Sequence, residues 1–241
     1  MRLGPPGVGM SLRELAVVVP IGPGECAWQG LLPQLADLPP AARIVLVATS
    51  DADLPRRSDP IAGALGAELV LLTAPRGRAL QQNAGAGAAE RRWLWFLHAD
   101  SRLAATTLPA LAASLERAPN ALGYFDLRFA GDGPVAVHLN ALGVLVRSRW
   151  LGLPFGDQGL FLARADFERL GGFDPTLQSG EDHALVWAAH RAGMVVASAR
   201  APLYTSARKY AEGGWLRTTA RHVWLTAAQA WREARRASGA T

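Results

Sequence analysis

The stretch Trp93-Leu-Trp-Phe-Leu-His-Ala-Asp-Ser101 is a short, almost continuously apolar segment that ends in polar residues. Unbroken apolarity over roughly four to eight residues is typical of a strand that is covered on both faces of its sheet. Ligands of parallel α/β sheets bind at the carboxyl ends of such strands. The stretch therefore predicts a buried strand over Trp93–His98, with Asp100 at the ligand-binding edge.

Similar apolar segments precede this one, and helical stretches separate them. Because strands and helices alternate, the pattern predicts a parallel, doubly wound α/β sheet. Crossovers between parallel strands are right-handed, so all four strands should end at one edge. The predicted strands are Leu15–Pro20, Arg43–Thr49, Glu68–Thr73 and Trp93–His98, and the predicted helices are Trp28–Leu38, Pro60–Leu65 and Arg78–Arg91.

The rhythm changes after Asp100, where helices predominate and the strands are short. The predicted elements are the helices Thr107–Arg117, Val135–Arg149 and Glu181–Ala192 and the strands Tyr124–Phe129 and Gly159–Ala163. No internal repeat or charged linker divides the chain. We expect one domain over 14–212, with a nucleotide-binding half (14–103) and an acceptor half (104–212). Residues 1–13 read as a flexible leader outside the fold.

Composition excludes several classes of protein. Half of the 241 residues are hydrophobic, which is too apolar for a disordered chain. The single cysteine, Cys26, excludes a disulfide scaffold and a cysteine-rich zinc site. No uncharged apolar run reaches the roughly 18 residues of a transmembrane helix. We expect a cytoplasmic protein.

The net charge of +5 comes from the end of the chain, because residues 200–241 hold eight cations and two anions. On a helical wheel, residues 213–241 form a basic amphipathic helix with tryptophans in its apolar stripe. The stripe comprises Leu216, Ala220, Val223, Trp224, Ala227, Trp231 and Ala234. This helix either packs on the domain or docks peripherally at the inner, anionic face of a membrane, near a lipid-borne acceptor. Nucleic-acid binding is not expected, because the rest of the chain is slightly acidic.

Five short segments contain the polar residues that are best suited to binding or catalysis. They are Gly77–Gly85, Phe96–Asp100, Gly156–Gln158, Glu181–Asp182 and Thr205–Arg208. Arg78 lies beside a helix start that favours phosphate, and Asp100 suits a hard divalent cation. Asp182 at a helix start could act as a base if its surroundings raise its pKa toward neutrality. A solvated arginine, a helix cap and a solvated Asp157–Gln158 turn are the structural alternatives.

Other catalytic classes lack their usual motifs. The five histidines show no zinc spacing, and the sequence has no G-x-G-x-x-G after a strand, no Walker loop and no G-x-S-x-G. These absences argue against zinc enzymes, nicotinamide dehydrogenases, P-loop kinases and serine hydrolases.

Taken together and in this order, the five segments resemble the family 2 glycosyltransferases, and most closely a bacterial subgroup with G-R-A-x-Q-x-N-A-G, F-L-H-A-D, G-D-Q, E-D and T-S-A-R motifs. The resemblance covers residues 15–221. It implies a GT-A fold, which is a Rossmann-like mixed sheet flanked by helices. It also implies an inverting, Mn²⁺- or Mg²⁺-assisted transfer from a nucleotide-diphospho-sugar, with a UDP-sugar as the first choice, to an acceptor hydroxyl.

The resemblance assigns roles to individual residues. Asp100 matches the last acid of the family's D-x-D metal site, and His98 stands where the first acid often does. Asp182 matches the general base, and Glu181 would orient it. The remaining matches are Arg78, Asn83 and Arg208 near the nucleotide-sugar, and Asp157 and Gln158 near the acceptor.

The chain departs from the family at the ends of its first two strands. The P-x-x-N-E motif keeps only its acid, Glu25, and the D-G-S-x-D motif is replaced by Ser50-Asp51-Ala-Asp53. The acid that would bind the nucleotide base is therefore missing or displaced to Asp51. Two alternatives stay open: a nucleotidyltransferase on a similar sheet, and a degenerate, non-catalytic sugar-nucleotide-binding protein at the membrane surface.

Overall fold

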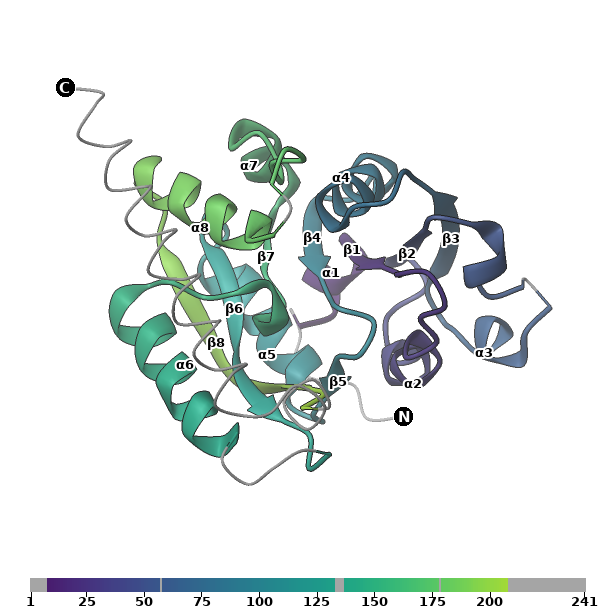
Figure 1. Cartoon of the computed structure of the whole chain (residues 1–241), viewed down its shortest axis with the longest axis horizontal. Coiled ribbons are helices and arrows are strands. Elements are labelled where there is room, and N and C mark those ends of the chain that lie inside the picture. Colours follow the sequence, from purple (N-terminus) through teal and green to yellow (C-terminus); the bar gives the residue numbers. More distant parts are fainter. Residues whose placement is uncertain (1–7, 57, 133–136, 178, 208–241) are drawn as a thin grey trace.

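Eight strands form one sheet in the order β3-β2-β1-β4-β7-β6-β8-β5 (Figure 1). The computed structural model describes residues 8–56, 58–132, 137–177 and 179–207 of the protein. The first four strands, β1 (Leu15–Pro20), β2 (Arg43–Ala48), β3 (Glu68–Thr73) and β4 (Trp93–Phe96), are parallel neighbours. The predicted doubly wound first half is therefore confirmed.

The second half makes the sheet mixed. Strand β7 (Phe161–Ala163) runs antiparallel to β4, and β6 (Leu122–Phe129) pairs with β7 through Gly123 and Phe161. A long strand outside the predicted elements, β8 (Val196–Thr205), runs parallel to β6, and the short β5 (Arg102–Leu103) completes the edge. The predicted mixed α/β sheet is confirmed.

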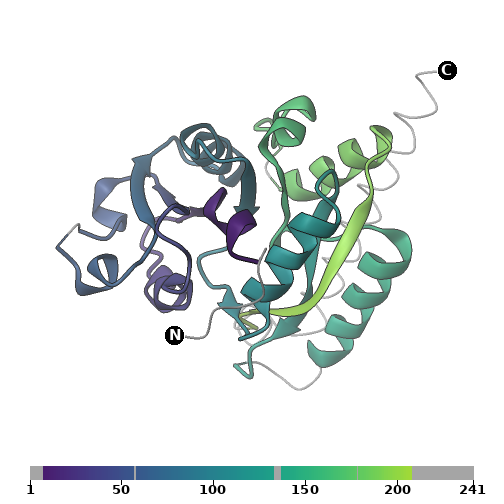
Figure 2. The same cartoon turned by 180° about the vertical axis from the view of Figure 1, so that it is seen from behind.

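Helices cover both faces of this sheet (Figures 1 and 2). The buried side of α2 (Trp28–Leu31), the 3-10 turn η1 (Leu32–Leu35) and α5 (Thr107–Arg117) shares one core with the strands. The opposite core contains residues of α4 (Arg78–Ala88), α7 (Arg164–Arg169) and α8 (Glu181–Arg191). Alternate residues of β1 point into the two cores, with Val17 in the first and Val18 in the second. This double coverage explains the unbroken apolarity of the strands.

The remaining helices lie outside the two groups that cover the centre of the sheet. They are α1 (Val8–Arg13), α3 (Pro60–Gly63), α6 (Val137–Leu151) and the 3-10 turns η2 (Asp51–Asp53) and η3 (Gly156–Gln158). The α6 helix packs its inner side on β6, where the Tyr124 hydroxyl donates to the Ser148 carbonyl oxygen at 2.8 Å. None of the helices in the described ranges is long and apolar enough to cross a bilayer.

The N-terminal segment corrects one prediction. Residues 1–13 were expected to be a leader outside the fold, but residues 8–13 form α1, and Leu12 is buried in the core. The Ser11 hydroxyl also donates to Glu116 of α5 at 3.3 Å. The Gly- and Pro-rich residues before this helix are typical of a flexible segment, so the sequence did not predict that Leu12 packs in the core.

Two contacts, one at Gly85 and one at Gln81, hold α4 against the sheet. A Cβ at Gly85 would lie only 2.5 Å from Val18 Cγ1, so glycine lets the helix lie close against β1. The buried Gln81 amide donates to the carbonyl oxygens of Ile21 and Val47 at 2.8 and 2.9 Å. These contacts fix the N-terminus of α4 at the carboxyl ends of β1 and β2.

Candidate active site

The carboxyl edge of the sheet brings together charged residues from four separate segments. Arg78 begins α4, Asp100 follows β4, Asp157 lies in η3, and Glu181 and Asp182 begin α8. Arg78 forms an ion pair with Glu181, and its Nη1 lies 3.4 Å from His98 Nε2. The charges of Asp182 and Asp100 both act on Asp157. The sequence therefore identified residues that the fold collects in one place.

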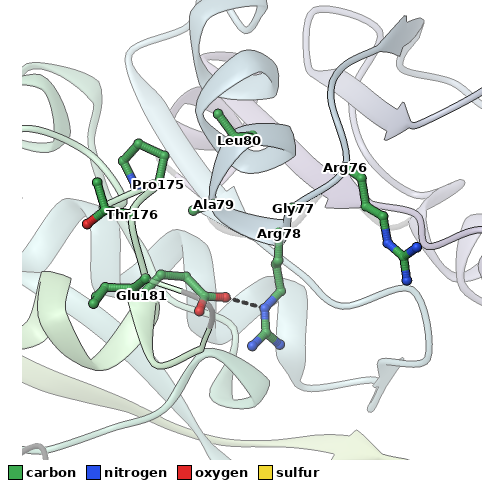
Figure 3. A pocket seen from close by; sticks show the side chains of 9 residues that line it. Arg76, Gly77, Arg78, Ala79, Leu80, Pro175, Thr176 and Glu181 are labelled. Carbon is green, nitrogen blue, oxygen red and sulfur yellow. Dashed lines mark hydrogen bonds and ion pairs between the residues drawn. The ribbon is translucent and has the colours of Figure 1, made fainter.

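The ion pair between Arg78 and Glu181 joins α4 to α8 (Figure 3). The Glu181 side chain is 2% exposed and that of Arg78 is 42% exposed, so the carboxylate is inside and the guanidinium faces the site. Burial opposes the charge of Arg78, but the carboxylates of Asp182 and Glu181 raise its pKa above the ordinary value. Arg78 is therefore a fixed cation at the start of a helix, where anions bind well.

Asp182 is held by backbone groups on both of its oxygens. Oδ2 accepts the Gly156 N–H and Oδ1 accepts the His183 N–H, the latter at 2.8 Å. Burial alone would raise the pKa of Asp182, but the charge of Arg78 and the two N–H donors lower it below the ordinary value. The carboxylate is therefore ionised at neutral pH, and the condition that its surroundings raise the pKa toward neutrality is not met.

The pKa of Asp157 is shifted in the opposite direction. Burial raises its pKa from 3.8 to about 6, the charge of Arg147 counteracts this rise, and the charge of Asp182 adds to it. Its Oδ1 atom is buried and accepts no hydrogen bond from the described residues. An unpartnered carboxylate oxygen in a site is available to a donor from a ligand, because a buried acceptor without a partner is costly.

Gln158, predicted to touch the acceptor, instead stabilises the η3 turn. It is fully buried, and its Oε1 accepts the Phe155 N–H at 3.1 Å. Its Nε2 donates to the Phe125 carbonyl oxygen at 2.9 Å. Because both the oxygen and the nitrogen of the amide are hydrogen-bonded to backbone groups, the Gln158 side chain is not free to bind an acceptor. The alternative of a solvated Asp157–Gln158 turn is also wrong.

Asn83, predicted to lie near the nucleotide, joins α4 to the turn after α7. Its Nδ2 donates to the Phe173 carbonyl oxygen at 2.7 Å, and its Oδ1 accepts the Phe173 N–H at 3.0 Å. This paired contact resembles a rung of a sheet ladder. It gives Asn83 a structural role in the arrangement of the site.

We predict that Asn83→Ala lowers the free energy of unfolding by about 2 kcal/mol, because two backbone groups lose their partners. Urea unfolding measures this change, with the exposed Gln29→Ala as the control. A nucleotide-contacting Asn83 with no structural role would leave the unfolding free energy of the variant within about 0.5 kcal/mol of that of the wild type.

The loops after β1 and β2 form the far end of the edge. Glu25 Oε1 accepts the Ala27 N–H at 2.8 Å within its own loop, and Asp51 is exposed. Asp53 Oδ1 accepts the Gly24 N–H at 2.8 Å and so joins the two loops. Sequence reasoning gave Asp53 no role, because nothing in the local pattern reveals a partner in another loop. Arg208 lies outside the described residues.

A pocket of about 480 Å³ opens beside the Arg78–Glu181 pair. Its walls are the first turn of α4 and the loop before α8, and Figure 3 shows both. The lining residues are Arg76, Gly77, Arg78, Ala79, Leu80, Pro175, Thr176, Leu177 and Glu181. The volume accommodates a small ligand beside the charged cluster.

The donor set after β4 fits a divalent cation that shares its ligands with a substrate. Within the described residues, no three His, Cys, Asp or Glu side chains are arranged to enclose a metal ion. Mg²⁺ and similar ions, however, are commonly held by one or two carboxylates, with waters and substrate phosphates completing the shell. Asp100 and its neighbour His98, both half-buried, provide such a partial set.

Comparison with solved structures identifies the architecture. TarS from S. aureus matches with a TM-score of 0.61 at 18% identity, over 81% of this chain and 37% of that one. The mannosyltransferase PcManGT from Pyrobaculum calidifontis, solved with GDP-Man and Mn²⁺, matches with a TM-score of 0.62 at 20% identity, over 91% of this chain and 64% of that one. The GT-A fold is common to these structural neighbours. This chain has a GT-A fold.

The GT-A likeness extends to a TarS fragment, residues 1–349, solved with UDP-GlcNAc, which matches with a TM-score of 0.58 at 17% identity over 80% of this chain and 58% of that one. The chain therefore spans 37% to 64% of the lengths of these structures. No protein-family model and no curated protein matches the sequence. The comparisons thus establish the GT-A fold of the chain.

Proposed function

We propose that the protein transfers a sugar from a nucleotide-diphospho-sugar to an acceptor hydroxyl with inversion of configuration. The observation that carries this proposal is the convergence of Arg78, Asp100, Asp157 and Asp182 at the carboxyl edge of a GT-A sheet. A fixed cation and a candidate metal ligand can stabilise charge on the departing diphosphate, and an ionised carboxylate can accept the proton of the acceptor hydroxyl.

The donor would bind with its diphosphate near Arg78 and Asp100. Arg78 supplies a fixed positive charge, and the loops after β1 and β2, with Glu25 and Asp51, would contact the nucleoside. His98 and Asp100 would hold Mn²⁺ or Mg²⁺, which stabilises charge on the departing diphosphate when it is bound. The ligands of the similar structures, UDP-GlcNAc and GDP-Man with Mn²⁺, support this donor class. A UDP-sugar is our first choice.

Asp182 would serve as the general base. The acceptor oxygen forms a bond to the anomeric carbon while the bond from that carbon to the phosphate oxygen breaks, and Asp182 takes the acceptor's proton. Arg78 and the backbone donors from Gly156 and His183 lower the pKa of Asp182, so it would act as a fully ionised and well-positioned proton acceptor rather than as a base tuned toward neutrality. Glu181 acts indirectly, because it holds Arg78 in place.

Asp157 would bind the acceptor through its unpartnered Oδ1. This atom lies in a turn whose Gly156 contacts Asp182, and a Cβ at Gly156 would lie 2.7 Å from Asp182 Oδ2. An acceptor hydroxyl that donates to Asp157 would therefore be held close to the proposed base. Because its pKa is about 6, Asp157 is also the second candidate for the base.

We predict that Asp157→Asn stabilises the protein at neutral pH. A carboxyl group whose pKa is raised on folding destabilises the folded state as pH rises from the ordinary value of 3.8 to about 6. The variant should match the wild type below about pH 4 and exceed it by about 2 kcal/mol above about pH 6. Urea unfolding across this range measures the difference, with the exposed Asp51→Asn as the control. A constant difference at all pH values would contradict the prediction.

A thermal-shift screen tests donor binding directly. A bound donor at about 100 times its Kd should raise Tm by about 5–10 °C. We expect UDP-, GDP- or dTDP-sugars to produce this shift more strongly with Mn²⁺ than without it. A protein that binds no nucleotide-sugar under either condition would refute the proposed function.

The second candidate function is a non-catalytic nucleotide-sugar-binding protein. It is favoured by the exposed position of Asp51 and by the use of Asp53 to bind Gly24, which leave the base-recognition end altered. A thermal shift without turnover on any donor would support it. We also propose a cytoplasmic location and a lipid-linked acceptor at the membrane. The C-terminal segment that would contact the membrane lies outside the described residues.

A further inference from the structure

The α6 helix carries apolar side chains on two opposite sides. Its inner side, with Val137, Ala141 and Ser148, is buried against β6 and its neighbours. The outer side exposes Leu142, Val146 and Trp150 by 59%, 49% and 84%. We call these three residues the α6 outer face. Helices that are apolar all round are normally covered on both sides, so this face points to an occupant.

The charges beside the α6 outer face are already engaged. Arg149 pairs with Asp126 of β6 through two hydrogen bonds, and the Arg147 guanidinium lies 3.3 Å from the centre of the Phe155 ring. An anionic lipid surface is attracted by free cations around an apolar face. Because the two arginines flanking Trp150 are used inside the protein, the face is better suited to another apolar protein segment.

The described chain ends beside this helix. Ala207 is fully buried in a cluster with Val137 and Ala141 of α6. Its N–H donates to Asp132 Oδ1 at 2.8 Å, and the Ser206 hydroxyl donates to Asp132 Oδ2 at 2.7 Å. The described chain therefore ends at a fixed point next to the N-terminal half of α6.

The sequence of this C-terminal segment has the matching pattern and length. Its apolar stripe from Leu216 to Ala234 would extend about 27 Å as a helix, and the α6 outer face from Leu142 to Trp150 extends about 12 Å. We propose that residues 213–241 form a helix that lies along α6 and covers the α6 outer face with this stripe. The arginines of the segment then remain in water, and the basic charge of the chain lies on a packed helix.

Disulfide trapping in the full-length chain tests this contact. The starting variant is Cys26→Ser, which removes the one cysteine. Val146→Cys is combined with Val223→Cys or Ala227→Cys in the stripe, or with Gln229→Cys on the opposite side of the wheel as the control. We expect intramolecular disulfides at least about ten times faster for a stripe pair than for the control. Equal rates for all pairs, or disulfides only between molecules, would overturn the proposal.

Trypsin digestion provides a second measurement without new cysteines. Residues 208–241 contain several arginines, and docking should protect them. We expect Trp150→Glu to speed cleavage in this segment by about ten-fold. The control Val195→Glu, at another exposed apolar residue, should leave the rate unchanged. Equal cleavage of the wild type and Trp150→Glu would overturn the proposal. So would wild-type binding to phosphatidylglycerol vesicles that Trp150→Glu abolishes, since it would assign the face to a membrane.

Discussion

Asp182→Asn is expected to lower the rate of sugar transfer by about 10²- to 10⁴-fold, because an amide cannot take the proton of the acceptor hydroxyl. The substitution keeps the size of the side chain and one of its two acceptor oxygens. It replaces the other with an NH₂ group that faces a backbone N–H donor, from either Gly156 or His183. We therefore also expect a loss of stability of about 1–2 kcal/mol. Steady-state turnover of the donor measures the first effect and urea unfolding measures the second.

The matched control is Asp37→Asn, which changes an exposed carboxylate in the loop before β2, at the opposite edge of the sheet. Its turnover should equal that of the wild type. If Asp182→Asn retained full turnover and Asp157→Asn lost it, the base would be Asp157. If both variants kept full activity, the site assignment would be wrong.

Arg78→Met is expected to destabilise the protein by about 3 kcal/mol. The substitution leaves the Glu181 carboxylate, which is 2% exposed, without its cation, and an unpaired buried charge is strongly unfavourable. The double variant Arg78→Met with Glu181→Gln should recover part of this loss, because the buried group is then neutral. Urea unfolding of the two single variants and the double variant gives the coupling energy between the residues.

Arg76→Met is the control for this prediction. Arg76 lines the same pocket two residues earlier and is also exposed, and Figure 3 shows its side chain set apart from the Arg78–Glu181 pair. It should change the unfolding free energy by less than about 0.5 kcal/mol. Equal losses for Arg76→Met and Arg78→Met would show that the ion pair does not stabilise the fold.

The first half of the fold could be predicted because its strands are short, apolar and separated by clear helical patterns. Strand β8 was harder to predict, for reasons that its backbone reveals. Arg200 has a positive φ of 57°, and the pairing with β6 shifts register between Tyr124 and Asp126. This irregularity breaks the two-residue alternation by which strands are identified. The helix α7 has only six residues, too few for a helical period to stand out.

Site residues could be predicted where their place at a strand end or a helix start is enough to bring them to the site. Asp100, Asp182 and Arg78 each follow a strand or begin a helix, so the fold places them at one edge. Asn83 and Gln158 belong to the same motifs, but their amides bind backbone groups of Phe173 and Phe125, which lie far away in the sequence. The sequence alone could not distinguish these structural amides from ligand-binding ones.

The pKa values of the two aspartates could not be predicted either. Asp157 and Asp182 are both acids in polar motifs, and only their surroundings separate them. Two backbone N–H groups and Arg78 lower the pKa of Asp182, and burial raises that of Asp157 to about 6. These contacts join residues from α4, η3 and α8, which come together only in the folded chain.

The most direct test of the proposed transfer is ³¹P NMR of the products formed from a nucleotide-diphospho-sugar, the diamagnetic ion Mg²⁺ and a cell-extract acceptor pool. We expect the wild type to release the intact nucleoside diphosphate, at a rate that falls at least about 100-fold in Asp182→Asn. Release of a sugar phosphate would mean attack at the α-phosphorus and a nucleotidyltransferase. That result, or equal release by the wild type and Asp182→Asn, would contradict the proposed function.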